Sequence, residues 1–222
     1  MTGAAPAERL TEIRARIEAA AKLARREAAE VTLVAVSKTH PVEAILPLIE
    51  AGQRHFGENR VQEAQAKWPE LKAAHPEVRL HLIGKLQSNK ADEAVALFDV
   101  IHSVDRLSLV EALGKAMTKA GKRPDCFIQV NVGDEAQKGG CAVAELPALM
   151  EATGEAGLPV AGLMCIPPAD VEPAPYFALL AKLARRHALP ALSMGMSGDF
   201  ETAVTIGATH VRVGTALFGE RA

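Results

Sequence analysis

The chain has 222 residues, of which 49% are hydrophobic and 23% are charged, and its formal net charge at pH 7 is −2. This length suits one large domain or two small ones, and a balanced charge offers no broad basic surface to duplex nucleic acid. No stretch reaches the roughly 18 uninterrupted apolar residues of a membrane span, so we expect neither nucleic acid nor a membrane as a partner.

The first predicted element is a helix in which apolar residues recur at three- and four-residue steps from Leu10 to Ala24, and which ends near 26–28. A continuous apolar run within 31–36 is typical of a parallel strand that is covered on both faces. Pro41 favours the start of a helix over 42–51. Further strands are predicted at 54–57, 79–83, 98–102, 126–131, 160–164, 190–193 and 210–213, and further helices at 59–72, 87–96, 105–120, 143–155, 173–188 and 198–207.

Eight strands that alternate with helices predict a closed (β/α)8 barrel of the TIM type. Only a short tail follows the last strand, so the N-terminal helix would stand in for the missing eighth helix. A flavodoxin-like open sheet is the alternative, although it needs only about five strands. The length leaves no room for a second domain. We therefore expect residues 1–222 to form a single domain, with a helix within residues 1–28 packing on the barrel.

The cysteines and the N-terminal segment bear on the cellular compartment. Cys126, Cys141 and Cys165 are odd in number and widely spaced, which suits a reducing compartment better than a disulfide framework or a zinc site. Charged residues between 8 and 14 interrupt the apolar core that a signal peptide would need. We therefore expect a cytoplasmic protein.

Small and hydroxyl residues follow the last two predicted strands. Ser197 stands where the N-cap of the helix 198–206 is expected, and Gly214 and Thr215 follow the strand 210–213. Because the carboxyl ends of barrel strands share one mouth, the two turns would lie side by side. Their backbone N–H groups, a positive helix end and two hydroxyls would form a cradle for a phosphate dianion.

Lys38 ends the first predicted strand and shares the parity of Val34 and Val36. If that parity is inward, the amine rises into the mouth, where a desolvated lysine has a lowered pKa and can attack a carbonyl to form an imine. An imine-forming lysine with a phosphate cradle is what pyridoxal 5'-phosphate (PLP) requires. Aldolases that act on phosphorylated sugars require the same pair, so these residues leave both classes open.

Arg212 lies two residues before Gly214. A guanidinium keeps its proton, so against a pyridine nitrogen it would act as a donor and leave that nitrogen unprotonated. A surface or ion-paired arginine is the alternative. Asn59 would hydrogen-bond beside the ring or cap the next helix. We predict no metal site, because His81 and His102 lack metal-ligand spacing.

Five ordered blocks of the sequence resemble the pyridoxal phosphate homeostasis proteins of the YggS/PROSC type. They are Val-Ala-Val-Ser-Lys-Thr at 34–39, Phe-Gly-Glu-Asn-Arg-Val-Gln at 56–62, His-Leu-Ile-Gly-Lys-Leu-Gln-Ser-Asn-Lys at 81–90, Leu-Ser-Met-Gly-Met-Ser at 192–197, and Val-Arg-Val-Gly-Thr at 211–215 with Phe-Gly at 218–219. The resemblance runs from about residue 8 to the C-terminus. It implies a barrel like the N-terminal domain of alanine racemase, which is fold type III of the PLP proteins.

The resemblance also implies how PLP is held. PLP would be bound as an internal aldimine to Lys38, with Arg212 facing the pyridine nitrogen and Asn59 in the pocket. The phosphate would be bound by Ser197, Gly214, Thr215 and the backbone amide of Gly198.

Proteins of this family are regarded as carriers or regulators of cellular PLP that affect vitamin B6 and amino-acid balance, without an established catalytic reaction. A racemase needs a second acid or base opposite the lysine, and the only tyrosine, Tyr176, follows a proline cluster, where we expect it to pack. We therefore expect a monomeric PLP-binding protein of PLP homeostasis that is not an enzyme, has no established catalytic residue and passes PLP to apo-enzymes. The alternatives are a PLP-dependent amino-acid racemase, a Schiff-base aldolase using Lys38, and a module whose target is another protein.

Overall fold

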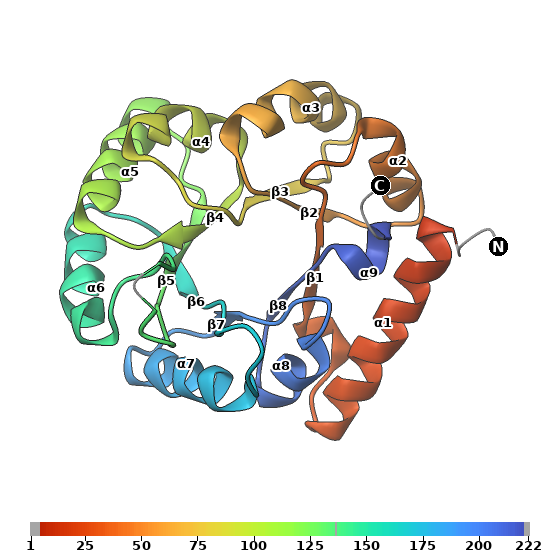
Figure 1. Ribbon diagram of the computed structural model, residues 1–222. Coiled ribbons are helices and arrows are strands. Elements are labelled where there is room, and N and C mark those ends of the chain that lie inside the picture. The colour runs from red at the N-terminus through yellow and green to blue at the C-terminus, as the bar shows by residue number, and fades with distance from the viewer. Residues whose placement is uncertain (1–4, 136, 220–222) are drawn as a thin grey trace.

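Eight parallel strands form a closed barrel, in which each strand pairs with the next along the chain and the last pairs with the first (Figure 1). The structure is a computed structural model that describes residues 5–135 and 137–219. The closed order confirms the predicted barrel, and the open flavodoxin-like sheet is wrong. The strands are β1 (Thr32–Val36), β2 (His55–Glu58), β3 (Arg79–Leu82), β4 (Val100–Val104), β5 (Asp125–Gln129), β6 (Val160–Met164), β7 (Ala191–Ser193) and β8 (His210–Val213).

Helices surround the barrel and cover its outer face (Figure 1). Three short 3-10 turns, at Ala28–Glu30, Ser88–Lys90 and Val143–Glu145, precede β1, α4 and α6. The strands at 100–104 and 125–129 differ by one or two residues from the predicted ones, and the helices at 61–74 and 200–206 begin two residues later than predicted. The helices are α1 (Pro6–Leu23), α2 (Val42–Glu50), α3 (Val61–Ala74), α4 (Ala91–Leu97), α5 (Leu107–Ala120), α6 (Leu146–Glu155), α7 (Ala174–Arg186), α8 (Phe200–Ile206) and α9 (Thr215–Phe218).

The N-terminal helix α1 lies against α2, α8 and the single turn α9, and so fills the gap that follows β8 (Figure 1). Its apolar stripe, including Leu10 and Ile13, is buried in the main core. The helix ends at Leu23, earlier than the predicted 26–28, because Arg25 takes a φ of +56° and the chain turns away. The Arg26 guanidinium then donates to the carbonyls of Val204 and Ala208, at 3.0 Å each, which anchors the turn to α8.

The barrel interior is filled by aromatic rings in its amino-terminal half. His81 and His102 are fully buried, and their ring centroids are 5.2 Å apart. Phe127 stacks on His102 at 4.5 Å and meets the ring of His210 edge-on at 5.0 Å. These rings fill the part of the interior that lies below the carboxyl ends of the strands.

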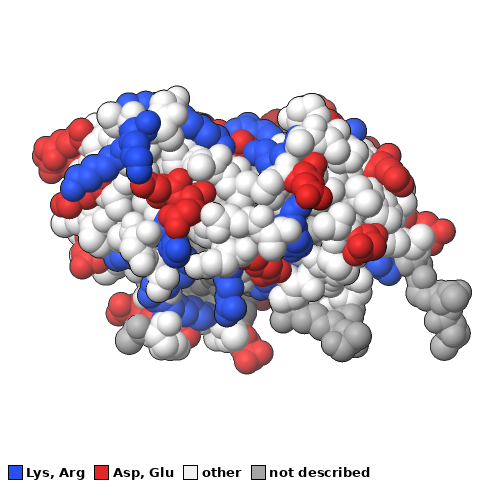
Figure 2. Space-filling model, turned by 90° about the horizontal axis from the view of Figure 1, so that it is seen from above, with Lys and Arg blue, Asp and Glu red and all other residues white. Residues whose placement is uncertain are grey.

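Charged side chains of both signs are interspersed on the face shown in Figure 2. This distribution fits the net charge of −2. No helix in the described part of the chain is both long enough and apolar enough to cross a membrane.

Candidate functional site

A cavity of about 470 Å³ opens at the carboxyl ends of the strands. Its size is within the usual range for sites that bind small molecules. The structure brings all seven predicted site residues together around it, although they come from four separate stretches of the chain. These residues are Lys38, Asn59, Ser197, Gly198, Arg212, Gly214 and Thr215.

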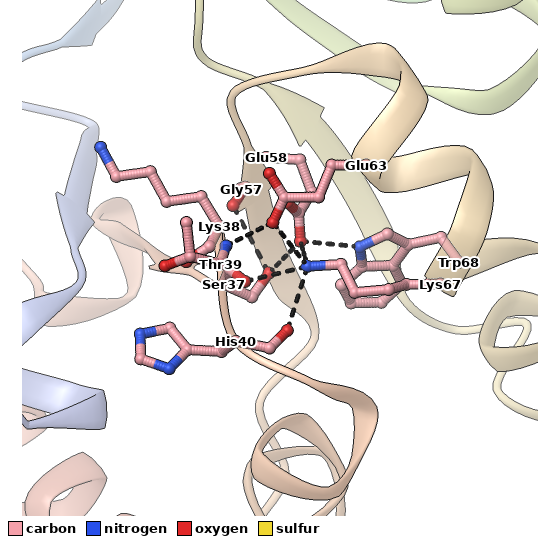
Figure 3. A network of polar contacts seen from close by, with 9 residues as sticks. All are labelled: Ser37, Lys38, Thr39, His40, Gly57, Glu58, Glu63, Lys67 and Trp68. Atoms are coloured by element: carbon pink, nitrogen blue, oxygen red, sulfur yellow. Dashed lines mark hydrogen bonds and ion pairs between the residues drawn. The ribbon is translucent and has the colours of Figure 1, made fainter. Parts of the chain in front are cut away.

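Lys38 directly follows β1 and lines the cavity together with Val36, as the inward parity predicted. Its neighbour Ser37 is fully buried on the other side of the strand, where its hydroxyl donates to Glu58 Oε1 at 2.7 Å. Figure 3 shows the Lys38 side chain extending away from the cluster of polar groups around Glu58 and Lys67. Because neighbouring residues of an extended chain point to opposite sides, Ser37 faces the polar cluster around Glu58, whereas Lys38 faces the cavity.

Ser197 has a different role from the predicted one. The N-cap residue of α8 is Asp199, whose Oδ1 accepts a hydrogen bond from Met196 N at 2.6 Å, because the helix begins two residues later than expected. The Ser197 hydroxyl instead accepts from the backbone N–H groups of Gly214 (3.3 Å) and Ala216 (3.4 Å) at the start of α9. A hydroxyl that accepts two bonds still has its own O–H to donate to a ligand.

The two loops after β7 and β8 are therefore tied together through Ser197. Gly198 and Thr215 flank this tie and line the cavity. Gly214 approaches β1 closely, since an added Cβ would lie 3.3 Å from Val36 Cβ. The arrangement places two hydroxyl residues, Ser197 and Thr215, and two glycine turns on one wall of the cavity, and hydroxyl donors suit an anion such as phosphate.

Arg212 lies at the floor of the cavity and is only 4% exposed. Its guanidinium donates to Ser193 Oγ at 2.6 Å and to the Cys165 carbonyl at 2.9 Å. Burial lowers the pKa of Arg212 from its ordinary value, yet a guanidinium stays protonated at neutral pH. The alternative of a surface arginine is wrong, and no carboxylate in the described part of the chain forms an ion pair with it. A ligand that offers an acceptor or a negative charge would stabilise this buried cation.

A column of hydrogen bonds continues from Arg212 toward the other end of the barrel. Ser193 Oγ contacts His102 Nδ1 at 2.8 Å, His102 Nε2 contacts His81 Nδ1 at 2.9 Å, and His81 Nε2 contacts His55 Nδ1 at 3.0 Å. Burial holds the pKa values of His81 and His102 well below the ordinary value, so both rings are neutral at pH 7. Within the described ranges, no group of three or more His, Cys, Asp or Glu residues is arranged to hold a metal ion.

Sequence reasoning missed several residues that line the cavity. Gln129 ends β5 with an inward parity that could have indicated it; it is 8% exposed, and no side-chain partner is found for it among the described residues. Lys85 is exposed, and it also lines this cavity. Gly84 lines the cavity where two backbone segments approach closely, since an added Cβ would lie 2.2 Å from the carbonyl oxygen of Asn59. His40 also lines the cavity and stacks on Phe218 with ring centroids 4.3 Å apart.

The tyrosine and the three cysteines that the sequence analysis considered do not form part of the candidate site. Tyr176 packs against the core and does not line the cavity, as expected. Cys126, Cys141 and Cys165 are buried, and burial raises the pKa of each thiol to about 12. The thiolate is the reactive form of cysteine, so these three side chains are inert at neutral pH.

Comparison with known proteins places this site in a family. Residues 9–222 match the family described as alanine racemase, N-terminal domain. The pyridoxal phosphate homeostasis protein of Pseudomonas aeruginosa is 45% identical over 222 residues, covering 97% of this chain and 95% of that protein. PipY from Synechococcus elongatus PCC7942, whose structure has PLP bound, is 41% identical with a TM-score of 0.82, covering 96% of this chain and 100% of that one.

A more distant likeness concerns the fold alone. The alanine racemase of Clostridium difficile 630 is 14% identical, with a TM-score of 0.72, and the match covers 96% of this chain and 57% of that one. The family match over residues 9–222 and the 45% identity to the Pseudomonas aeruginosa protein show that the chain belongs to the alanine racemase N-terminal domain family and, within it, to the family of the pyridoxal phosphate homeostasis proteins.

Proposed function

We propose that this protein binds PLP in the cavity at the carboxyl ends of its strands and serves in PLP homeostasis. One observation carries the proposal: Lys38, the loops tied by Ser197 and the buried cation of Arg212 line the same cavity. The names of the relatives support it, since proteins 37–45% identical to this chain are called pyridoxal phosphate homeostasis proteins. We also propose that residues 1–222 form one PLP-binding domain.

The residues around the cavity fit the chemical groups of PLP. Lys38 would provide the amine for covalent attachment, and Ser197, Gly198, Gly214 and Thr215 would bind the phosphate. Arg212 would donate to the pyridine nitrogen, and Asn59 would hydrogen-bond beside the ring. When bound, PLP supplies an electrophilic aldehyde and an electron-withdrawing ring. The protein's part is to hold, orient and release the cofactor.

We propose a carrier that holds and releases PLP without turning over amino acids, and that acts as a monomer in the cytoplasm. Tyr176, the only tyrosine of the sequence, lies outside the cavity, so it provides no base opposite Lys38. The proposed recipients of PLP are apo-enzymes that require it. Turnover of an amino acid by the purified protein at an ordinary enzymatic rate would contradict the carrier role, and a racemase assay would detect it.

The test of binding is the absorption spectrum of the protein after incubation with PLP. We expect a band near about 420 nm, which borohydride removes while fixing the cofactor on the peptide that contains Lys38. Lys38→Ala should abolish the band and the labelled peptide, whereas Lys85→Ala keeps the attachment point and is the matched control within the same cavity. A protein that stays colourless in excess PLP would overturn the proposal.

The test of transfer uses the loaded protein and an apo-form of a PLP-dependent enzyme. We expect the enzyme to become active faster than PLP is released into buffer, even when a scavenger removes free PLP. Activation that stops when the scavenger is present would reduce the role of the protein to storage.

A further inference from the structure

We propose that Lys67 and Glu58 are positioning residues for Lys38: they clamp the turn that carries it, so that its amine is presented to the cavity at a fixed place. Neither residue lines the cavity, so neither is part of the predicted set of ligand contacts. The inference rests on the proposed binding of PLP at Lys38. Its experiments include a measurement on the protein without PLP, so the two proposals can fail separately.

The turn at 37–40 is held in an unfavourable conformation. His40 N donates to the Ser37 carbonyl at 3.1 Å and closes the turn, and Thr39, inside it, has a φ of +65°. A β-branched residue rarely adopts a positive φ, and such strain persists only where the surrounding structure enforces it. The residue directly after Lys38 therefore needs external support.

Lys67 supplies that support from helix α3. Its ammonium, on a side chain that is 11% exposed, donates to the carbonyls of Ser37 (3.0 Å) and His40 (3.2 Å), which are the first and last residues of the turn. The same Nζ contacts Glu63 Oε1 at 3.2 Å, and this carboxylate also accepts a hydrogen bond from Thr39 N. One cation thus joins both ends of the turn, and its neighbouring anion holds the strained residue.

Glu58 holds the ammonium of Lys67 in place. Its carboxylate is fully buried, and Oε1 contacts Lys67 Nζ at 2.8 Å, Ser37 Oγ at 2.7 Å and Trp68 Nε1 at 3.0 Å. Oε2 is also buried, and it has no hydrogen-bond partner in the described part of the chain. Desolvation makes a buried ion pair a poor source of stability, and an unsatisfied oxygen makes it poorer. What this cluster does achieve is fixed geometry around residues 37–40.

Figure 3 shows where the Lys38 side chain lies relative to this cluster. The cluster lies on one side of the turn, and the Lys38 side chain leaves on the other side. The clamp therefore fixes the backbone from which the amine projects. A misplacement of about 1 Å at a reacting group can slow a reaction by about a hundredfold. Loosening the turn should accordingly slow covalent attachment of PLP.

The experiment compares Lys67→Met with Lys72→Met. Lys72 lies on the same helix and makes matching contacts away from the cavity, to Asp99 Oδ2 at 2.5 Å and to the Leu97 carbonyl at 3.2 Å. We expect PLP to attach to Lys67→Met about tenfold more slowly than to the wild type, and to Lys72→Met at the wild-type rate. The melting temperature should fall in both variants, so a loss of stability alone cannot produce the difference.

A second measurement uses the protein before PLP is added. Hydrogen exchange of the backbone amides in the peptide spanning 37–40 should be faster in Lys67→Met and unchanged in Lys72→Met. If Lys67→Met does not fold, Glu58→Gln retains the shape of the cluster without its charge and should show the same two effects to a smaller extent. Equal attachment rates in Lys67→Met and Lys72→Met, or unchanged exchange at 37–40, would overturn the clamp. A wild-type protein that binds no PLP would overturn the proposed function instead, while the exchange measurement would still test the clamp.

Discussion

The two halves of the barrel interior are built from the same strands but bury polar groups in opposite ways. In the amino-terminal half, His81 and His102 are buried, as is Gln53 in the loop that precedes β2, and each of these side chains hydrogen-bonds to other protein groups. In the carboxyl-terminal half, Gln129 is buried without a side-chain partner among the described residues, and Arg212 carries a charge that no carboxylate of the described chain pairs. Satisfied polar groups stabilise a fold, whereas an amide without a partner and a charge without a counter-ion beside a cavity are groups that a ligand can satisfy.

The largest expected effect is the loss of stability at low pH that the buried histidines cause. It would test whether the amino-terminal half of the barrel interior stays folded only while these rings are neutral. Burial lowers the pKa of His210 to about 4 and those of His81 and His102 well below 6.5. The unfolded chain therefore binds more protons than the folded chain below pH 6.5. The free energy of unfolding should fall as pH drops, by up to about 1.4 kcal/mol per pH unit for each histidine, or up to about 4 kcal/mol per pH unit for the three.

Urea unfolding at pH 7, 6 and 5 measures this slope. In His210→Phe the slope should become shallower, because one titrating ring is removed. His187→Gln is the control, because it removes a histidine at the end of α7 without touching the buried rings. If the free energy of unfolding depends on pH equally in both variants, His210 is not a source of the acid sensitivity.

The next effect concerns Ser193, which joins the two halves through bonds to Arg212 and His102. Ser193→Ala leaves a buried guanidinium N–H without its acceptor and should lower the free energy of unfolding by about 2 kcal/mol. The visible spectrum of bound PLP should change too, because Arg212 loses a contact that orients it.

Ser103→Ala is the matched control for Ser193→Ala. Ser103 is equally buried, but its Oγ has no hydrogen-bond partner in the described part of the chain. Removing that hydroxyl should leave stability unchanged or raise it slightly. If Ser103→Ala costs as much as Ser193→Ala, the contact with Arg212 is not the reason for the loss.

A smaller effect is expected at the phosphate cradle. Ser197→Ala should weaken retention of PLP by about 1 kcal/mol or somewhat more, which corresponds to the loss of a charge-assisted hydrogen bond. Thr205, on the exposed face of α8, is the control, since its hydroxyl donates only to the Glu201 carbonyl. Dialysis of the loaded proteins gives the comparison, and equal loss of PLP from Ser197→Ala and Thr205→Val would refute the cradle.

The smallest effect on stability is expected at Gln129. Because its amide has no partner among the described residues, Gln129→Leu should change the free energy of unfolding by no more than about 0.5 kcal/mol while reducing PLP retention. Gln53→Leu is the contrasting variant. Gln53 Nε2 donates to the carbonyls of Leu33 (2.6 Å) and His55 (2.7 Å), so its loss should cost about 2 kcal/mol and leave PLP retention unchanged. If Gln129→Leu and Gln53→Leu lowered the free energy of unfolding equally, the two halves of the barrel would not differ in how they use buried polar groups.

The sequence by itself predicted the barrel and most of the cavity wall. Hydrophobic periodicity and turn residues act over a few neighbouring positions, so the strands and helices could be predicted to within a few residues. Strand alternation placed Lys38 in the cavity, and the rule that strand ends share one mouth brought it together with Gly214 and Thr215. That these residues bind PLP remains a prediction.

Only the tertiary structure decided the contacts that join distant parts of the chain. Ser197 was expected to cap its own helix, but it binds the N–H groups of Gly214 and Ala216 because the closed barrel brings β7 and β8 side by side. The bonds of Lys67 to the Ser37 carbonyl and of His102 to Ser193 join residues 30 and 91 positions apart. Local patterns carry no information about such pairs, because they exist only after the barrel has closed and packed its helices.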